Sequence, residues 1–154
     1  MTERCIELVK RFEGFVPHIY ICPAGYPTIG YGHVVLEHEI ERFKDGITEE
    51  EAEELLKQDL LRRERRILPW IKVVIHPWML DAILSFVFNI GCWAFYSSTL
   101  RRKLNRGEFL GAADEFPRWV YSRGRKLRGL VRRRAAEREL FLEGVERLWV
   151  MRWI

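Results

Sequence analysis

The sequence has few cysteines, and their spacing indicates no shared site. Cys5, Cys22 and Cys92 are an odd number and include no Cys-x-x-Cys pair. We therefore expect no disulfide framework, at most one bridge within a monomer, and reduced thiols of the kind found in a cytoplasm. The four histidines include no His-x-x-x-His pair, so we expect neither a metal site nor a cofactor.

Long uninterrupted apolar runs are also missing. The most apolar window, residues 73–95, is interrupted by four residues: His76, Pro77, Asp81 and Asn89. A spanning helix needs ~20 predominantly apolar residues, so a buried helix fits this window better. The first eleven residues mix charges at helical spacing and contain no apolar segment typical of a secretory signal. We expect no signal peptide, no stable membrane anchor and synthesis in the cytoplasm.

What the chain does contain is enough apolar material for one folded domain. Its 154 residues are 48% hydrophobic and 13% aromatic, which allows a sizeable core. The formal net charge is +4, and arginine outnumbers lysine. A basic surface is attracted to polyanions, namely nucleic acid, anionic lipid or an acidic cell wall, and charge alone does not choose among them.

Helical and extended patterns alternate in a way that predicts two lobes. Thr2 can cap a helix over residues 1–12, which delivers Glu13 at its end. Residues 13–47 lose the helical period and combine β-branched residues with glycines and prolines, which is typical of a small sheet. Thr48 and Glu51 form a capping-box pattern that opens a connecting helix over residues 48–68. The sequence therefore predicts a small β-containing lobe, a long helix and a helical lobe.

The helical lobe, residues 69–154, has its own start and stop signals. Residues 77–90 are apolar nearly all round and predict a central helix that Gly91 ends. Ser97 or Ser98 can cap the next helix, and a short helix is expected from 108 to 116. Gly124 and Gly129 are expected to frame a loop before a last arginine-rich helix. The tail, with Trp149, Met151 and Trp153, is expected to form a final helix on the core. We predict an α+β fold that is mostly α.

Candidate chemistry gathers between Glu13 and His33. A glutamate can act as a general acid when burial or nearby negative charge raises its pKa, and Phe12 and Phe15 could provide the burial. Cys22 and Thr28 add a thiol and a hydroxyl. Each residue taken alone has a plainer interpretation, as a surface charge, a buried thiol, a strand threonine or a structural histidine.

The spacing of three of these residues resembles that of a known family. Glu13, eight residues, Cys22, five residues and Thr28 resemble the Glu…Asp/Cys…Thr pattern of the phage-type lysozymes, the endolysins of glycoside hydrolase family 24. Residues 88–91 (Phe-Asn-Ile-Gly) with 98–100, and residues 118–121 with 129–137, resemble two further blocks of that family. The resemblance implies a two-lobed, lysozyme-like fold. It also implies hydrolysis of the β-1,4 bond between N-acetylmuramic acid and N-acetylglucosamine in peptidoglycan, which lyses the host cell.

The same resemblance implies roles for individual residues. Glu13 would be the acid, and Cys22 and Thr28 would hold and activate water in an inverting reaction. The residues implied in substrate binding are Val34, Phe88, Asn89 and Thr99, with Phe88 against a sugar face and Asn89 bonded to an acetamido or hydroxyl group. Arg133 is the best candidate for a cation near Glu13, within one residue of register, and His33 is a supporting residue. No metal is implied.

Cys22 occupies a position where many family members carry aspartate. A thiol has an ordinary pKa near 8.5, so Cys22 could act as a thiolate base, as a weak water ligand or as a nucleophile. The resemblance further implies peptidoglycan rather than nucleic acid as partner, a holin-type membrane permeabiliser, a monomeric enzyme, and release to the cell wall at lysis.

Two other functions remain open from the sequence. Cys22 as nucleophile with His33 as base could cut amide bonds in the wall. The arginine- and tryptophan-rich C-terminal segment could instead disrupt anionic membranes as an amphipathic helix. The cations of residues 123–134 could be a solvated helix face or an adhesive surface for an anionic envelope.

Overall fold

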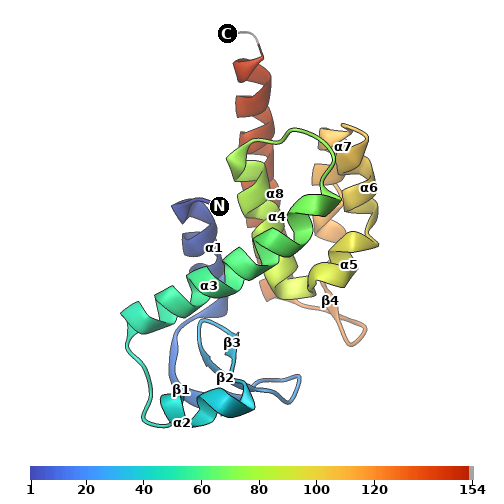
Figure 1. The fold of residues 1–154 in the computed structure, drawn as a ribbon. Helices are drawn as coiled ribbons and strands as arrows, with labels where there is room; N and C mark the ends of the chain where they lie inside the picture. Colours follow the sequence, from blue (N-terminus) through green and yellow to red (C-terminus); the bar gives the residue numbers. More distant parts are fainter. Residues whose placement is uncertain (153–154) are drawn as a thin grey trace.

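Residues 1–152 are described in a computed structural model, in which a small β lobe and a helical lobe are joined by one long helix (Figure 1). The helices are α1 (Glu3–Glu13), α2 (Ile40–Phe43), α3 (Glu49–Ile67), α4 (Pro77–Ile90), α5 (Cys92–Tyr96), α6 (Thr99–Asn105), α7 (Phe109–Ala113) and α8 (Arg128–Met151). The strands are β1 (Val16–Ile21), β2 (Pro27–Gly30), β3 (His33–Val34), β4 (Tyr121–Ser122) and β5 (Arg125–Lys126). The prediction of a mostly helical α+β fold is confirmed.

Helix α1 is predicted over residues 1–12 and is observed over Glu3–Glu13. The Thr2 side chain accepts a hydrogen bond from the backbone N–H of Arg4, as an N-cap does, and also bonds Asp81 of α4. Gly14 ends the helix with φ +72°, a backbone conformation that glycine adopts readily. Because the helix stops there, Glu13 is its last residue and lies where the β lobe begins.

The three-stranded sheet β1-β2-β3 is antiparallel and small, as the sequence predicts. Its register pairs Tyr20 with Thr28, and Thr28 with Val34. Beyond β1 the chain turns tightly, since the N–H of Cys22 donates to the carbonyl of Tyr26 at 2.9 Å. This turn holds Cys22 beside the start of β2.

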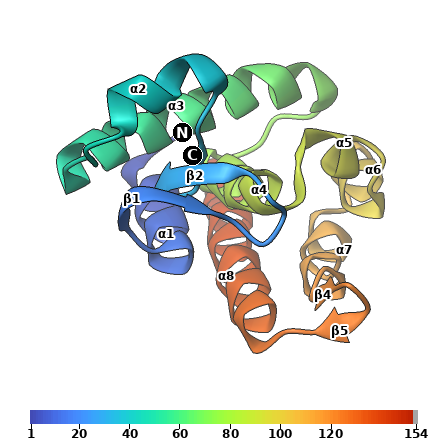
Figure 2. The ribbon, with the colours of Figure 1, turned by 90° about the horizontal axis from the view of Figure 1, so that it is seen from below.

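Helices α3 and α4 confirm two further predictions. The reciprocal hydrogen bonds of Thr48 and Glu51 form a capping box at the start of α3. Helix α4 lies among α1, α3, α5 and α8 and is buried over most of its circumference (Figure 2). Gly91 ends α4 with its N–H on the carbonyl of Val87. Among the described helices, none is long and apolar enough to cross a bilayer.

Two short segments differ from the sequence prediction. The helix expected from 108 to 116 is only α7, and the chain then makes a 3₁₀ turn, η3 (Phe116–Arg118). Pro117 fits this turn because a helix start needs no N–H donor there. Residues 92–96 form α5, a helix that the sequence did not indicate. Short elements of this kind carry too few residues for a clear periodic signal.

The loop and the tail near the C-terminus also differ from prediction. Gly124 lies in the β4–β5 hairpin, but Gly129 lies in the first turn of α8 and frames no loop. The tail is no separate helix, because α8 runs on to Met151 and extends past the other helices at the top of Figure 1. Trp149 and Met151 are 42% and 61% exposed, so they do not dock on the core. Trp153 lies outside the described residues.

We predict that Gly144→Ala in α8 lowers the free energy of unfolding by roughly 1–3 kcal/mol, because an added methyl group overpacks the contact with α4. A Cβ at this position would stand 2.7 Å from both the Cγ and the backbone nitrogen of Met79. Gly129→Ala is the control, since a Cβ there meets nothing within 4 Å. It should leave stability unchanged or raise it by up to about 1 kcal/mol. Urea unfolding compares the two, and equal effects would contradict the close packing of α4 on α8.

Candidate active site

Glu13 is held by a buried arginine from the far end of the sequence. The Nη1 of Arg133 on α8 donates to Oε1 of Glu13 at 2.7 Å. The other donors of Arg133 reach Oε2 of Glu137 at 3.2 Å and the carbonyl oxygen of Ser85 at 3.0 Å. The Arg133 side chain is 4% exposed. Because each of its three nitrogens donates a hydrogen bond, the guanidinium has little freedom to move. One oxygen of Glu13 is therefore fixed.

The second oxygen of Glu13 faces the turn between β2 and β3. A Cβ built on Gly32 would lie 3.0 Å from Oε2 of Glu13 and 3.4 Å from Cε1 of Phe88. Gly32 also has φ +77°, so a larger residue would be strained as well as crowded. The backbone of the β lobe can therefore approach the carboxylate closely.

Two cavities lie near the end of α1, and Glu13 lines the smaller one. One cavity, of about 540 Å³, is lined by residues of α1, α4 and α8 that include Glu13, Asn89, Arg132 and Arg133. The other, of about 880 Å³, runs from Gly32 along β3 and faces α3 and α5. Four arginines of α3 line this larger cavity: Arg62, Arg63, Arg65 and Arg66.

Aromatic rings hold two of these arginines in the larger cavity. The guanidinium of Arg63 lies 4.7 Å from the ring centre of Phe88, and that of Arg66 lies 5.1 Å from the ring centre of Trp93. Cation–π contacts of this kind orient a guanidinium without neutralising it. The family resemblance implied that the ring of Phe88 packs against a sugar face. In this structure the guanidinium of Arg63 lies over that ring.

Cys22 and Thr28 lie together at the turn end of the β1–β2 hairpin. The Thr28 side chain is buried, and its hydroxyl donates to the carbonyl of Tyr26 at 2.9 Å. Hydrogen bonding from the Tyr26 backbone lowers the pKa of the Cys22 thiol most, partial burial opposes this, and the rotatable hydroxyl of Thr28 lowers it further. The thiolate of Cys22 is therefore easier to form than that of an ordinary cysteine.

Tyr20 is a residue that the sequence did not single out. Burial raises its pKa most, and the negative charges of Glu13 and Cys22 raise it further. It also pairs with Thr28 across the hairpin. The alternation of side chains along a strand could not predict the direction of Tyr20, because the register of β1 shifts between Val16 and Tyr20.

His33 of β3 contacts Asp59 of α3 and Glu39 in the segment that follows β3. Its Nδ1 lies 2.8 Å from Oδ2 of Asp59, and its Nε2 lies 3.2 Å from Oε1 of Glu39. Burial lowers the pKa of His33, but hydrogen bonds and charges from Asp59 and Glu39 outweigh burial and leave this pKa raised. Both ring nitrogens are engaged, so His33 is not free to act as a base for Cys22.

The remaining expected residues fall in three different places. Val34 lines the larger cavity and is 43% exposed. Asn89 lines the smaller cavity, and its Oδ1 accepts a hydrogen bond from Nη2 of Arg134 at 2.9 Å. Thr99 begins α6, where its hydroxyl accepts from Arg102 at 2.8 Å, and it is not among the described residues that line either cavity.

A buried charge cluster lies behind the site and includes two arginines of the run 132–134. Arg133, Arg134 and Glu137 are each less than 5% exposed. Nε of Arg134 lies 2.8 Å from Oε1 of Glu137 without hydrogen-bond alignment, and Ser85 donates to Oε2 of Glu137 at 2.6 Å. Burial lowers the pKa of Arg134 to about 10 and raises the pKa of Glu137. The spacing of 133, 134 and 137 on one helix face was the signal available in the sequence.

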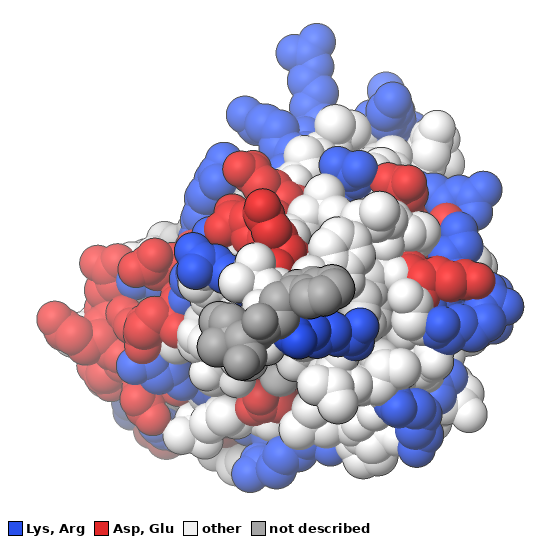
Figure 3. All heavy atoms as spheres, turned by 90° about the horizontal axis from the view of Figure 1, so that it is seen from above, with Lys and Arg blue, Asp and Glu red and all other residues white. Residues whose placement is uncertain are grey.

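The exposed cations lie beside this cluster, on β4, β5 and the start of α8. They are Arg123, Arg125, Lys126, Arg128 and Arg132. The N-terminal half of α3 instead carries five glutamates. Figure 3 shows acidic side chains gathered on the left, the side where α3 begins in Figure 1, with Lys and Arg spread over the rest of that face. The net positive charge is therefore unevenly distributed.

Much of the apolar side of helix α8 packs inside the protein. Its apolar residues Leu140, Phe141, Val145 and Leu148 are buried in the core. That face is not free to enter a membrane while the protein is folded.

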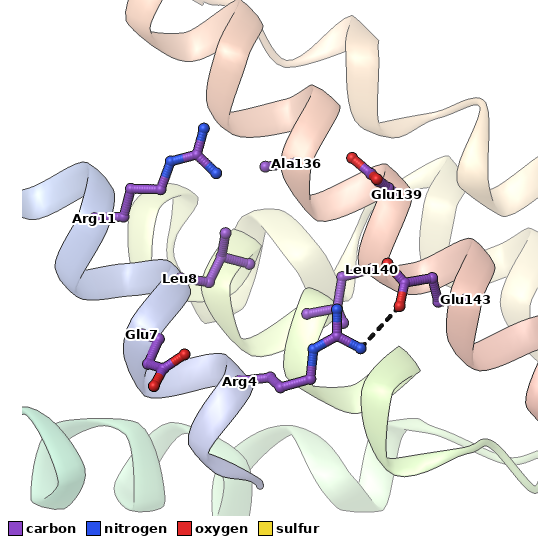
Figure 4. A pocket seen from close by; sticks show the side chains of 8 residues that line it. All are labelled: Arg4, Glu7, Leu8, Arg11, Ala136, Glu139, Leu140 and Glu143. Carbon is purple, nitrogen blue, oxygen red and sulfur yellow. Dashed lines mark hydrogen bonds and ion pairs between the residues drawn. The ribbon is translucent and has the colours of Figure 1, made fainter.

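A smaller groove of about 310 Å³ lies between α1 and α8 (Figure 4). It is lined by charges of both signs, and Arg4 pairs with Glu143 across it at 2.9 Å. None of the described residues expected at the site lines this groove. Arg11 lines both this groove and the smaller cavity, so the two are neighbours along α1.

Comparison with known proteins gives consistent matches along the chain. The sequence profile described as "Phage lysozyme" matches residues 10–137. The endolysin of Acyrthosiphon pisum secondary endosymbiont phage 1 is 41% identical over 145 residues, which are 92% of this chain and 97% of that protein. The endolysin of Bacillus phage B103 is 41% identical over 147 residues, or 94% of this chain, which spans 54% of its length.

Solved structures agree with these sequence matches. A crystal structure of a P22 lysozyme mutant has a TM-score of 0.81 at 36% identity and covers 92% of this chain and 97% of its own. The muramidase domain of SpmX from Asticaccaulis excentricus has a TM-score of 0.80 at 34% identity, with coverage of 92% and 96%.

We predict that His33→Gln lowers stability in a pH-dependent way. Because the folded-state pKa of His33 is raised above its ordinary value of 6.5, the stabilisation is complete below that value and is lost as the pH rises through the folded pKa. The variant should lose on the order of 2 kcal/mol at pH 5.5 and progressively less above neutrality. Unfolding from pH 5 to 9 measures this, with exposed His38→Gln as control. A pH-independent loss would contradict the ion pair.

Proposed function

The chain belongs to the phage lysozyme family of peptidoglycan-lysing enzymes, and we propose that it cleaves the β-1,4 bond between N-acetylmuramic acid and N-acetylglucosamine with Glu13 as general acid. One observation carries this proposal: Glu13 lines a cavity of the helical lobe, lies beside Gly32 of the β lobe and is held there by a buried arginine. A glycan strand laid through this cavity would pass the carboxyl group of Glu13.

The two oxygens of Glu13 have different roles in this proposal. Oε1 is engaged by Arg133, which fixes the orientation of the carboxyl group. Oε2 lies towards Gly32 and is the oxygen left to carry the proton to the leaving glycosidic oxygen. A general acid must be within hydrogen-bond reach of the atom it protonates, and Gly32 has no side chain to fill the space beside Oε2.

Cys22 and Thr28 would hold and activate the attacking water. The lowered pKa of Cys22 supports a thiolate that accepts a proton from that water. An inverting reaction requires this base to lie across the sugar from the acid, with room for water between them. Among the described residues that line the smaller cavity, Glu13 is the only carboxylate. These residues therefore include no second carboxylate that could act as the nucleophile of a retaining reaction.

The proposal includes how the enzyme meets its substrate. By resemblance, it acts as a monomer made in the cytoplasm, and a holin-type permeabiliser gives it access to the wall. The exposed cations of β4, β5 and α8 would favour adhesion to an anionic envelope. The amide-cleaving alternative receives less support, because His33 is engaged by Asp59 and Glu39.

We predict that Glu13→Gln lowers the release of reducing sugar ends from purified peptidoglycan by at least about a hundredfold, because the amide cannot donate the acid proton. Exposed Glu7→Gln on the same helix is the matched control and should keep wild-type activity. Release of free amines instead of reducing ends would mean that the enzyme is an amidase or peptidase. Lysis that survives Glu13→Gln would point to membrane disruption.

We predict that Cys22→Asp retains lysis, while Cys22→Ala loses about tenfold to a hundredfold, because aspartate can still orient and deprotonate water and alanine cannot. Nuclear magnetic resonance of the first-formed sugar gives the anomeric outcome. Inversion supports water activation by Cys22, and retention would make Cys22 a nucleophile. A fully active Cys22→Ala variant would remove this residue from the mechanism.

A further inference from the structure

The buried carboxylate of Glu137 contacts two arginines that face different parts of the proposed site. Arg133 bonds Glu137 at 3.2 Å and reaches Glu13, while Arg134 lies 2.8 Å from Glu137 and reaches Asn89. Glu137 is fully buried, and Ser85 of α4 donates to it at 2.6 Å. One carboxylate is therefore the common anchor of two guanidinium groups.

The contact between Arg134 and Asn89 fixes the direction of an amide. A guanidinium only donates hydrogen bonds, so the Asn89 atom that faces Nη2 of Arg134 must be its oxygen. The amide nitrogen then lies on the other branch of a side chain that lines the cavity containing Glu13. Asn89 thereby offers an N–H donor, which suits a carbonyl oxygen such as that of an acetamido group.

We propose that Glu137 is a positioning residue that sets the acid through Arg133 and the sugar-binding amide through Arg134. This proposal rests on the proposed function and adds a residue that acts on it without touching substrate. The arrangement separates two effects: the branch through Arg133 governs the orientation of Glu13 and hence kcat. The branch through Arg134 governs the hydrogen bond from Asn89 and hence KM. Both branches depend on the charge of Glu137.

The experiment measures kcat and KM for release of reducing ends from purified soluble peptidoglycan, with the melting temperature of each variant. Glu137→Gln should lower kcat by about tenfold to a hundredfold, because the acid loses its fixed orientation. It should also raise KM about threefold to tenfold, the effect of one lost hydrogen bond. Glu137→Asp keeps the charge and should recover part of both losses.

A second pair of variants separates the branches. Arg134→Met should raise KM about threefold to tenfold and leave kcat within about twofold, because Arg133 still holds Glu13. Arg133→Met should do the reverse. Exposed Glu139→Gln, two residues from Glu137 on the same helix, is the matched control and should change neither constant.

Glu137→Gln can fail to fold, because it leaves two buried arginines without their shared counter-charge. The double variant Glu137→Gln/Arg134→Met removes one charge of each sign and should fold, with KM raised as in Arg134→Met. Folded variants with an unchanged KM for both Arg134→Met and the double variant would overturn the proposal. Absence of reducing ends from the wild-type enzyme would instead overturn the proposed function.

Discussion

The interaction on which the rest of the structure depends is the buried contact of Arg133 with Glu13. It joins residues 120 positions apart and brings the last residue of α1 against the N-terminal part of α8. A buried guanidinium is tolerated only where its donors find acceptors, and these come from α1, α4 and α8 together. The packing of these three helices therefore also places the candidate acid Glu13.

The close approach of α4 and α8 serves the same requirement. The two helices make the most extensive contact in the fold, with Gly144 against Met79 at one end and Ser85 against Glu137 further along. Because no side chain stands between the helices at Gly144, the buried polar cluster can close with short hydrogen bonds. A hydrophobic core and a charged cluster thus share one interface, and each limits how far the other can shift.

The β lobe reaches the acid by different means. His33 ties β3 to α3 through Asp59, and Gly32 lets the turn beside it lie against Glu13. The large cavity beyond is lined by arginines of α3, two of which are stacked on Phe88 and Trp93. This wall retains positive charge because aromatic rings orient a guanidinium without supplying a counter-ion.

Local signals in the sequence determined much of the fold. Thr2, the Thr48–Glu51 box and Gly91 mark helix ends through contacts within a few residues, so they could be identified without the tertiary structure. The extended segment after Glu13 was equally clear. The spacing of Glu13, Cys22 and Thr28, with blocks further along the chain, also pointed to the family to which the chain belongs. These features depend on neighbours in sequence, which is why they could be predicted.

The family resemblance named Arg133 as the cation near Glu13 within one residue of register, and only the tertiary structure decided which arginines are buried. Residues 132–134 are three arginines in a row, yet Arg132 is exposed while Arg133 and Arg134 are enclosed. Helix periodicity gives each a direction, but the burial of a charge depends on acceptors from α1 and α4, which are distant in sequence. The same holds for Glu137, Tyr20 and His33. The sequence determined the candidate chemistry, and long-range packing decided its geometry, because desolvation and hydrogen bonding act on groups that only the fold brings together.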